Sequence, residues 1–235
     1  MNHGRLSVGI IGAGPVGTVL GQALAAAGHR IVGIATTSQE NAERAESLLP
    51  DVPVISVPDI LELADLVLLA IPANQIAPTV AGLAEANMWR SGQLVAHTAG
   101  EFGIDVLAPA TKQGVIALAI HPAMSFTGTS IDLARIRESY FAVAAPAVAI
   151  PIAQALVIEM GAEPFVISEE NRATYFEAIS VATSFSAMIV NQAIGLLETA
   201  GIDNARGVLG PVFRSSVEQA IAEGHKPIDT DELLG

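Results

Sequence analysis

The sequence has no cysteine, and it has few aromatic and few basic residues. Without cysteine the chain can form no disulfide, thiolate nucleophile or cysteine-based metal site, and no metal site of any kind is predicted. Aromatic residues are only 4% of the chain, so aliphatic side chains must build the core, as is usual in layered α/β proteins. Eleven Lys and Arg against 24 Asp and Glu give a formal net charge of −13, which would repel nucleic acid.

Apolar side chains are plentiful. Hydrophobic residues make up 51% of the 235 residues, and the mean hydropathy is +0.51, so the chain must fold compactly. The first five residues lead directly into a strand pattern with no signal peptide, which predicts a cytoplasmic protein. The longest apolar stretch, 181–197, is interrupted by polar residues and falls short of the ~18 apolar residues of a spanning helix. We therefore expect this stretch to be buried in protein and expect no membrane partner.

Short apolar runs alternate with helical patterns through the first two thirds of the chain. This alternation is typical of βαβ units and predicts a doubly wound, mainly parallel sheet of the Rossmann type. Expected strands lie at 7–11, 30–35, 53–56, 65–71, 93–97, 114–120, 139–144 and 164–167. Expected helices lie at 16–27, 39–49, 74–85 and 150–160. We assign residues 1–167 to a dinucleotide-binding domain.

The alternation stops at Ser168, and residues 168–235 are expected to form a small all-α domain. Ser168 and the two acids after it are suited to begin a helix, which would reach about Thr199. A second helix is expected from about 204 to 222. The long helix is apolar on almost every side over 178–197, which one domain cannot cover. The sequence therefore predicts a homodimer formed through the C-terminal helices, which would also bear on the substrate site.

The strongest motif is a G-x-G-x-x-G run directly after the first expected strand. Gly12 would allow a tight turn, Gly14 would let a pyrophosphate approach the backbone, and Gly17 would let helix and strand pack closely. Pro15 suits the first turn of a helix, where its missing N–H is not needed. The run predicts a dinucleotide site formed by residues Gly12, Ala13, Gly14, Pro15, Val16 and Gly17. The alternative is a glycine-rich turn without a ligand.

The end of the second expected strand bears on the type of cofactor. An NAD enzyme usually has Asp or Glu there for the ribose 2′-hydroxyl, whereas this chain has Thr36, Thr37 and Ser38. These hydroxyls, with Arg44 nearby, could hold a 2′-phosphate, so the sequence favours NADP over NAD. Thr37 and Glu40 could instead form only a helix capping box, or the capping box and the phosphate contact could occur together. A third possibility is that nucleotide affinity has been lost.

Four motifs together resemble a known group of proteins. They are the glycine turn, the strand end Leu68-Leu69-Ala70-Ile71-Pro72, then His97-Thr98-Ala99-Gly100, and His121-Pro122-Ala123-Met124-Ser125-Phe126. In this order they resemble the Rossmann-like family with a C-terminal domain of unknown function. That family belongs to the 6-phosphogluconate dehydrogenase-like superfamily, near deazaflavin-dependent NADP oxidoreductases and prephenate dehydrogenases.

The resemblance implies an oxidoreductase site. It implies that Ile71 and Pro72 line the nicotinamide-ribose side, and that His97 and His121 lie at the carboxyl ends of adjacent strands, where ligands bind in open α/β sheets. By similarity to prephenate dehydrogenases, His121 is our candidate acid/base for alcohol–ketone interconversion. His97 is a second catalytic candidate, although it could equally hydrogen-bond only backbone. Ser125, also a catalytic candidate, and Thr98 could orient substrate or nicotinamide.

The chain also departs from that family's pattern. Phe176 and Phe185 stand where members usually carry a polar His and Asn on the long helix. Hydroxyacid dehydrogenases and ketopantoate reductases of the superfamily usually have a lysine on that helix to polarise the carbonyl, and this chain has none there. Tyr175, Ser184 and Asn191 remain as its candidate polar groups.

Two functional hypotheses follow. The first is an NAD(P)-dependent oxidoreductase acting on a small carbonyl or hydroxy substrate. The second is a nucleotide-binding protein of the same fold without hydride transfer, acting as a sensor or structural partner. A purely structural dimer with an empty cleft is a weaker third, because the three glycines would then carry an unneeded entropic cost.

Overall fold

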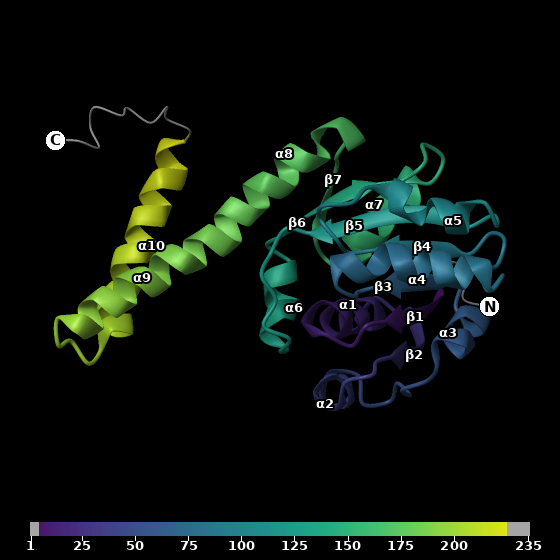
Figure 1. Cartoon of the computed structure of the whole chain (residues 1–235), viewed down its shortest axis with the longest axis horizontal. Helices are drawn as coiled ribbons and strands as arrows, with labels where there is room; N and C mark the ends of the chain where they lie inside the picture. The colour runs from purple at the N-terminus through teal and green to yellow at the C-terminus, as the bar shows by residue number, and fades with distance from the viewer. Residues whose placement is uncertain (1–4, 225–235) are drawn as a thin grey trace. The chain divides into compact units, whose positions relative to one another are not determined.

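A seven-stranded sheet forms the centre of the fold. In the computed structural model, which describes residues 5–224, the strand order is β2-β1-β3-β4-β5-β6-β7 (Figure 1). All neighbouring strands are parallel except β5 and β6, which are antiparallel. The strands are β1 Ser7–Ile11, β2 Arg30–Ala35, β3 Leu66–Leu69, β4 Leu94–His97, β5 Ile116–Pro122, β6 Tyr140–Ala144 and β7 Glu163–Val166. The predicted fold class, an α/β doubly wound sheet followed by helices, is confirmed.

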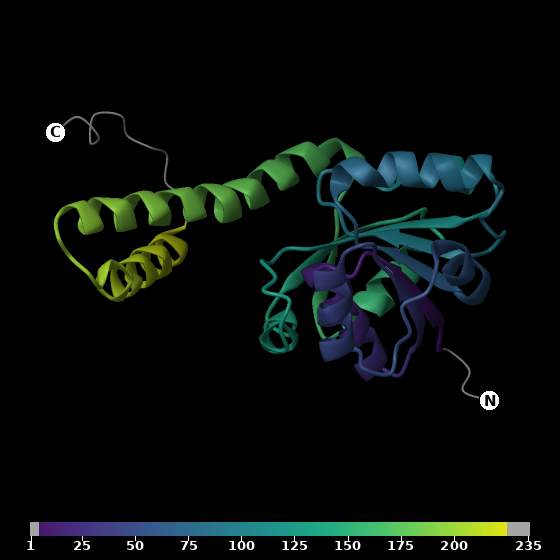
Figure 2. The same cartoon turned by 60° about the horizontal axis from the view of Figure 1, so that its bottom comes forward.

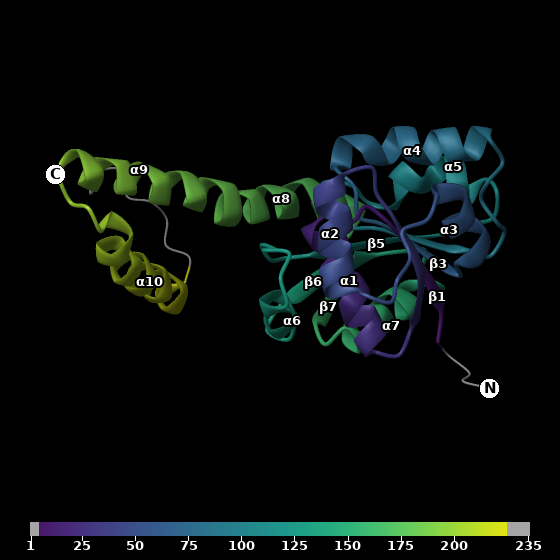
Figure 3. The same ribbon diagram turned by 90° about the horizontal axis from the view of Figure 1, so that it is seen from below.

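Helices cover both faces of this sheet (Figure 3). The helices of the first part of the chain are α1 Pro15–Ala26, α2 Gln39–Leu48, α3 Val57–Leu63, α4 Ala73–Glu85, α5 Ala108–Thr111, α6 Ile131–Ile136 and α7 Ile150–Glu159. Side chains of α1, α2, α6 and α7 pack in one buried cluster, and those of α3, α4 and α5 pack in another. Because alternate strand residues point to opposite faces, β1 to β5 each contribute to both clusters, which explains their continuous apolar runs.

The expected strand at 53–56 does not form. The structure has only a single parallel bridge there, between Ile34 and Val54. Pro53 lacks the N–H that a ladder needs, and Ser56 accepts a hydrogen bond from the backbone N–H of Asp59 (3.3 Å), which begins α3 instead. Helices α3, α5 and α6 were not predicted, since segments of four to seven residues are too short to show a helical period.

The C-terminal part is helical, as predicted. It consists of α8 Glu169–Ser180, a π-helical turn η2 Val181–Phe185, α9 Ser186–Thr199 and α10 Ala205–Glu223. The chain divides into compact units 1–177 and 178–235, so the boundary between the units lies about ten residues after the predicted domain boundary at 167/168. Within the second unit, α10 folds back beside α9 (Figure 2). The functional assignment of the two domains stays a prediction.

Over the residues that the structure describes, a single chain does not cover the long apolar helix, so its expected burial depends on the predicted second copy and stays a prediction. The helix Glu169–Thr199 is long and apolar enough to cross a membrane by length and composition, and none of its apolar window is buried in the structure. The polar residues within 181–197 are too few to take it below that threshold. One such helix is weak evidence for a membrane, because helices of soluble proteins pass the same test.

Candidate nucleotide-binding and active site

The glycine turn joins β1 to α1 in a shape that only glycine fits at two positions. Gly12 has a φ of +107°, and a Cβ there would lie 2.3 Å from the carbonyl oxygen of Ala70. A Cβ on Gly17 would lie 2.0 Å from the carbonyl oxygen of Gly12, so helix and turn are in close contact. A Cβ on Gly14 would meet nothing within 4 Å, so this backbone borders open space. The turn therefore exposes main chain to a ligand.

The N-terminus of α1 adjoins the same open space. No side chain caps it, its first turn holds no acid, and Pro15 occupies the first turn. Free backbone N–H groups at a helix start, with the helix dipole, favour an anion. The open backbone at Gly14 and this uncapped helix end fit the pyrophosphate of a dinucleotide.

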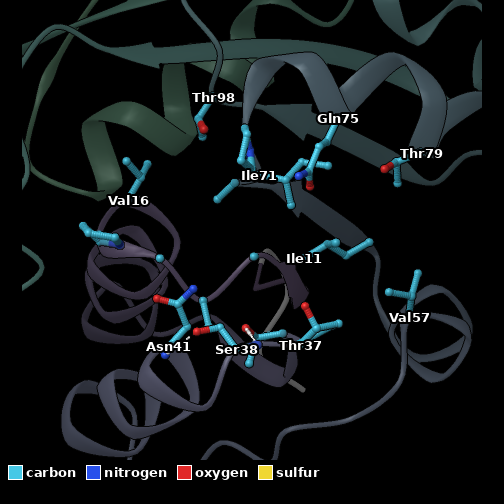
Figure 4. A pocket seen from close by; sticks show the side chains of 18 of the residues that line it. Ile11, Val16, Thr37, Ser38, Asn41, Val57, Ile71, Gln75, Thr79 and Thr98 are labelled. Atoms are coloured by element: carbon cyan, nitrogen blue, oxygen red, sulfur yellow. Dashed lines mark hydrogen bonds between the residues drawn. The ribbon is translucent and has the colours of Figure 1, made fainter.

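A cavity of about 780 Å³ lies over this turn (Figure 4). Figure 4 shows Val16, Thr37 and Ser38 on one side of the cavity and Ile71 and Thr98 on the other. The predicted cofactor residues that line it are Gly12, Ala13, Gly14, Pro15, Val16, Thr36, Thr37, Ser38, Ile71, Pro72 and Thr98. Gly17 is buried beneath the turn and does not line the cavity. Asn41, Gln75 and Thr79 also line it and were not predicted, because helical polar residues give no local signal.

The alternative of a Thr37–Glu40 capping box is wrong. Ser38 is the N-cap of α2 and accepts a hydrogen bond from the backbone N–H of Asn41 (3.4 Å). Thr37 is exposed and free to face a ligand, while the guanidinium of Arg44 pairs with Glu40 (2.9 Å). The hydroxyls at this end of the cavity thus remain compatible with a 2′-phosphate.

The two predicted histidines lie on neighbouring strands, β4 and β5, at the carboxyl edge of the sheet. His97 is fully buried, and its Nε2 donates to the carbonyl oxygen of Gly103 (2.8 Å). Since that carbonyl can only accept, Nδ1 of His97 is an acceptor, and it has no partner among the described residues. Burial lowers the pKa of His97 to about 4, so its imidazole is neutral at pH 7.

His121 is only partly buried and is held by the long helix. Its Nδ1 lies 2.6 Å from the hydroxyl oxygen of Tyr175 on α8, and the two rings meet edge to face. Burial, and then the charge of Arg172, lower the pKa of His121 to about 4. Burial raises the pKa of Tyr175 to about 12. Both groups are therefore neutral near pH 7, and the phenol donates to Nδ1 when Nε2 carries the imidazole proton.

Gly100 provides the space for this imidazole. A Cβ at Gly100 would lie 2.8 Å from both Cε1 and Nε2 of His121. The glycine after the His97-Thr98 motif therefore lets the two histidine-bearing segments pack together.

Arg172 is the functional candidate that the sequence did not indicate. It lies in the first turn of α8, is 3% exposed, and its charge lowers the pKa of both His97 and His121. An arginine in a polar first turn looks like a surface residue, and only the fold brings it to the two histidines. No local signal could have identified it.

The other predicted residues are less closely engaged. Ser125 is exposed in the loop after β5, and buried Asp132 holds that loop by accepting from the backbone N–H groups of Thr127 (2.7 Å) and Gly128 (2.9 Å). Ser184, Phe185 and Asn191 are exposed and belong to the second unit, while Phe176 is partly buried in the first. In residues 5–224 no group of three or more His, Asp or Glu side chains could hold a metal ion.

These features define a Rossmann-type fold with an open cavity over the glycine turn. Residues 1–122 match the profile of the Rossmann-like domain, and residues 139–230 match the domain of unknown function DUF2520. The chain belongs to this Rossmann-like family with a C-terminal DUF2520 domain. The predicted resemblance is thus confirmed.

Solved structures share the fold at low sequence identity. A putative NADP oxidoreductase from Bacteroides fragilis is 19% identical, with a TM-score of 0.75 and coverage of 92% of this chain and 80% of that one. A 1-pyrroline-5-carboxylate reductase from Streptococcus pyogenes is 18% identical, with a TM-score of 0.69 and coverage of 98% and 84%. The pyrroline carboxylate reductase of Plasmodium falciparum, solved with NADP bound, is 12% identical, with a TM-score of 0.65 and coverage of 94% and 80%. No curated protein matches the sequence.

Proposed function

We propose that the protein is an NAD(P)-dependent oxidoreductase that acts on a small carbonyl or hydroxy substrate, with His121 as acid/base. The observation that carries the proposal is the open cavity over an uncapped helix start, next to strand ends that hold two neutral histidines. The fold neighbours described as NADP oxidoreductase and as a reductase with NADP bound support it.

The cofactor would lie along the cavity. Its pyrophosphate would meet the backbone at Gly14, its adenosine ribose would lie at Thr36, Thr37 and Ser38, and its nicotinamide end would lie toward Ile71 and Thr98. When bound, a nicotinamide cofactor supplies or accepts a hydride. The hydroxyl groups at the end of β2, where no carboxylate would repel a 2′-phosphate, favour NADP over NAD.

His121 would move the proton. In the tautomer with Tyr175 donating to Nδ1, Nε2–H can hydrogen-bond a substrate carbonyl and give its proton to the oxygen while Nδ1 takes the proton of the phenol. The imidazole thus stays neutral, and the phenolate left on Tyr175 regains its proton from water. In the reverse direction Nε2 accepts the hydroxyl proton while Nδ1–H returns its proton to the deprotonated oxygen of Tyr175, so the imidazole again stays neutral. A pKa of about 4 keeps the imidazole neutral at pH 7, as both directions require.

Titration of the purified protein with NADPH and NADH, followed by fluorescence or calorimetry, tests the first part of the proposal. We expect NADPH to bind more tightly than NADH, and failure of both to bind would contradict the proposal. A screen of carbonyl and hydroxy compounds with the His121→Asn variant tests the second part. Turnover that is unchanged in His121→Asn would remove this histidine from the mechanism, and binding without any turnover would favour the non-catalytic nucleotide-binding hypothesis.

We also propose that the second unit forms a homodimer. Its paired helices expose apolar side chains that water disfavours, namely Val181, Phe185, Met188, Ile189 and Leu196 from the long helix and Val208, Val212, Val217 and Ile221 from α10. A second copy fits this surface better than a membrane, because the net charge of −13 would be repelled by anionic lipid headgroups.

Sedimentation analysis tests the dimer. We expect a dimer in detergent-free buffer and dissociation in the Ile189→Glu variant, with the exposed Glu198→Gln change as a control that leaves the dimer intact. A monomeric wild-type protein would contradict the proposal. So would a protein that is soluble only in detergent.

A further inference from the structure

Arg172 is a buried cation whose hydrogen-bonding groups are unused. Nε, Nη1 and Nη2 are all buried, and none has a hydrogen-bond partner among residues 5–224. Its side chain is 3% exposed. A guanidinium carries five N–H donors, and leaving them unpaired away from water is costly. Such a group is expected where an acceptor arrives from outside the chain.

The protein groups around Arg172 do not satisfy it. Glu169, one turn earlier on α8, is exposed, and its Oε1 accepts from the backbone N–H of Ile104 (3.2 Å) without an ion pair to the guanidinium. Tyr175, one turn later, is bonded to His121. His97 presents a second unpaired polar atom, its Nδ1. Unused donors and an unused acceptor thus gather beside the proposed acid/base.

We propose that Arg172 binds the carboxylate of the substrate, which is therefore a small carboxylic acid that also bears the carbonyl or hydroxyl group acted on. That this acid also bears a carbonyl or hydroxyl group rests on the proposed oxidoreductase function. The planar fork of a guanidinium matches the two oxygens of a carboxylate. His121 and Tyr175, the side chains of the proposed acid/base pair, are both partly exposed.

Charge favours a carboxylate over a phosphate. Arg172 is one positive charge, His97 and His121 are neutral at pH 7, and Glu169 is an acid on the same helix. A carboxylate balances the single charge, whereas a phosphate dianion would leave one negative charge buried without a partner. The cofactor's phosphates have their own place at the glycine turn, and Arg172 does not line that cavity.

Ligand binding to the protein, measured with and without NADP⁺, tests the inference without turnover. The probes are acetate, oxamate, malonate and succinate at equal ionic strength, with oxamide as the uncharged counterpart of oxamate and inorganic phosphate as the competing anion. Thermal unfolding and calorimetry report binding. We compare wild type with Arg172→Met and Arg172→Lys, and use Arg137→Met, which removes an exposed arginine, as the matched control.

We expect at least one carboxylate to bind wild type and raise its Tm, oxamide to have no effect, and Arg172→Met to lose at least tenfold in carboxylate affinity. Arg137→Met should behave as wild type. Because Arg172→Met removes an unpaired buried charge, its Tm without ligand should equal or exceed that of wild type. If Arg172→Met does not fold, Arg172→Lys takes its place in the comparison. The inference is overturned if no carboxylate binds, if Arg172→Met binds as wild type does, or if phosphate binds more tightly than every carboxylate.

Titration of the same variants with NADPH separates this inference from the proposed function. NADPH that binds all variants, with no carboxylate bound, defeats the inference alone. Carboxylate bound through Arg172 in a protein that does not bind NADPH defeats the proposed function and leaves the anion site standing.

Discussion

The glycine turn and the cluster of His97, His121 and Arg172 lie at the same edge of the sheet, but the turn is made of backbone and the cluster of side chains. The turn is backbone and small residues around an open cavity, with Gly14 facing free space. The cluster is made of side chains, with His97 and Arg172 almost fully buried and polar atoms left unpaired. The first region suits a ligand that many proteins share, while the second would decide which substrate is used.

The largest effect is expected at the glycine turn, from Gly14→Val. Gly14 has an extended backbone conformation that valine can adopt, and its Cβ would meet nothing, so the fold should survive. The valine methyl groups would occupy the place of the pyrophosphate and weaken NADPH binding by about a thousandfold or more, roughly 4 kcal/mol. Fluorescence titration measures this loss.

Gly14→Ala should show a smaller loss and serves as the graded control. If NADPH binds Gly14→Val normally, the open backbone is not the dinucleotide site, and the contrast between the two regions fails.

The two regions also differ in how far the sequence could predict them. The glycine turn is a local backbone constraint, so the spacing of Gly12, Gly14 and Gly17 was enough to place it after β1. The contact between His121 and Tyr175 joins residues 54 apart in sequence, and burial of Arg172 depends on where α8 packs. No periodicity or motif contains that information.

The fold shows the same division. Strands such as β1 and β2 were predicted to the residue because buried parallel strands are continuous apolar runs. The segment 53–56 has the same apolar character, but Pro53 and the N-cap at Ser56 take it out of the sheet.

Acid should destabilise the cluster region. His97 and His121 have pKa values of about 4 in the folded protein against 6.5 in the unfolded chain, so the unfolded state binds more protons between these values. The contribution of the neutral histidines to stability should therefore be fully present above pH 6.5. The free energy of unfolding should fall as the pH drops from 6.5 to about 4, by up to about 3 kcal/mol for buried His97. Denaturant unfolding at several pH values measures the slope.

His97→Gln keeps a side-chain donor for Gly103 but cannot titrate. The free energy of unfolding of this variant should therefore fall less steeply between pH 6.5 and 4 than that of wild type. The slope that remains comes from His121 and the carboxylates. Equal slopes in the two proteins would contradict the depressed pKa of His97.

Gly100→Ala should damage the cluster and spare the turn. The added Cβ would lie 2.8 Å from Nε2 of His121, so the imidazole must shift away from Tyr175. Loss of a positioned acid/base reduces turnover by about a hundredfold, the lower end of the usual range, while NADPH affinity should stay within about twofold. Steady-state kinetics and cofactor titration on one preparation measure both. Turnover that survives while NADPH binding is lost would reverse the assignment of roles to the two regions.

The smallest effect is expected at the adenosine end, from Arg44→Met. The guanidinium of Arg44 pairs with Glu40, and Arg44 does not itself line the cavity, so only part of its charge is available to a 2′-phosphate. We expect NADPH affinity to fall by about fivefold, roughly 1 kcal/mol, with NADH affinity unchanged. Glu40→Gln is the matched variant, because it releases the guanidinium from its carboxylate and should strengthen NADPH binding slightly. Opposite shifts in the two variants would sharpen the preference for NADP, whereas equal changes for NADPH and NADH would show that Arg44 acts on α2 alone.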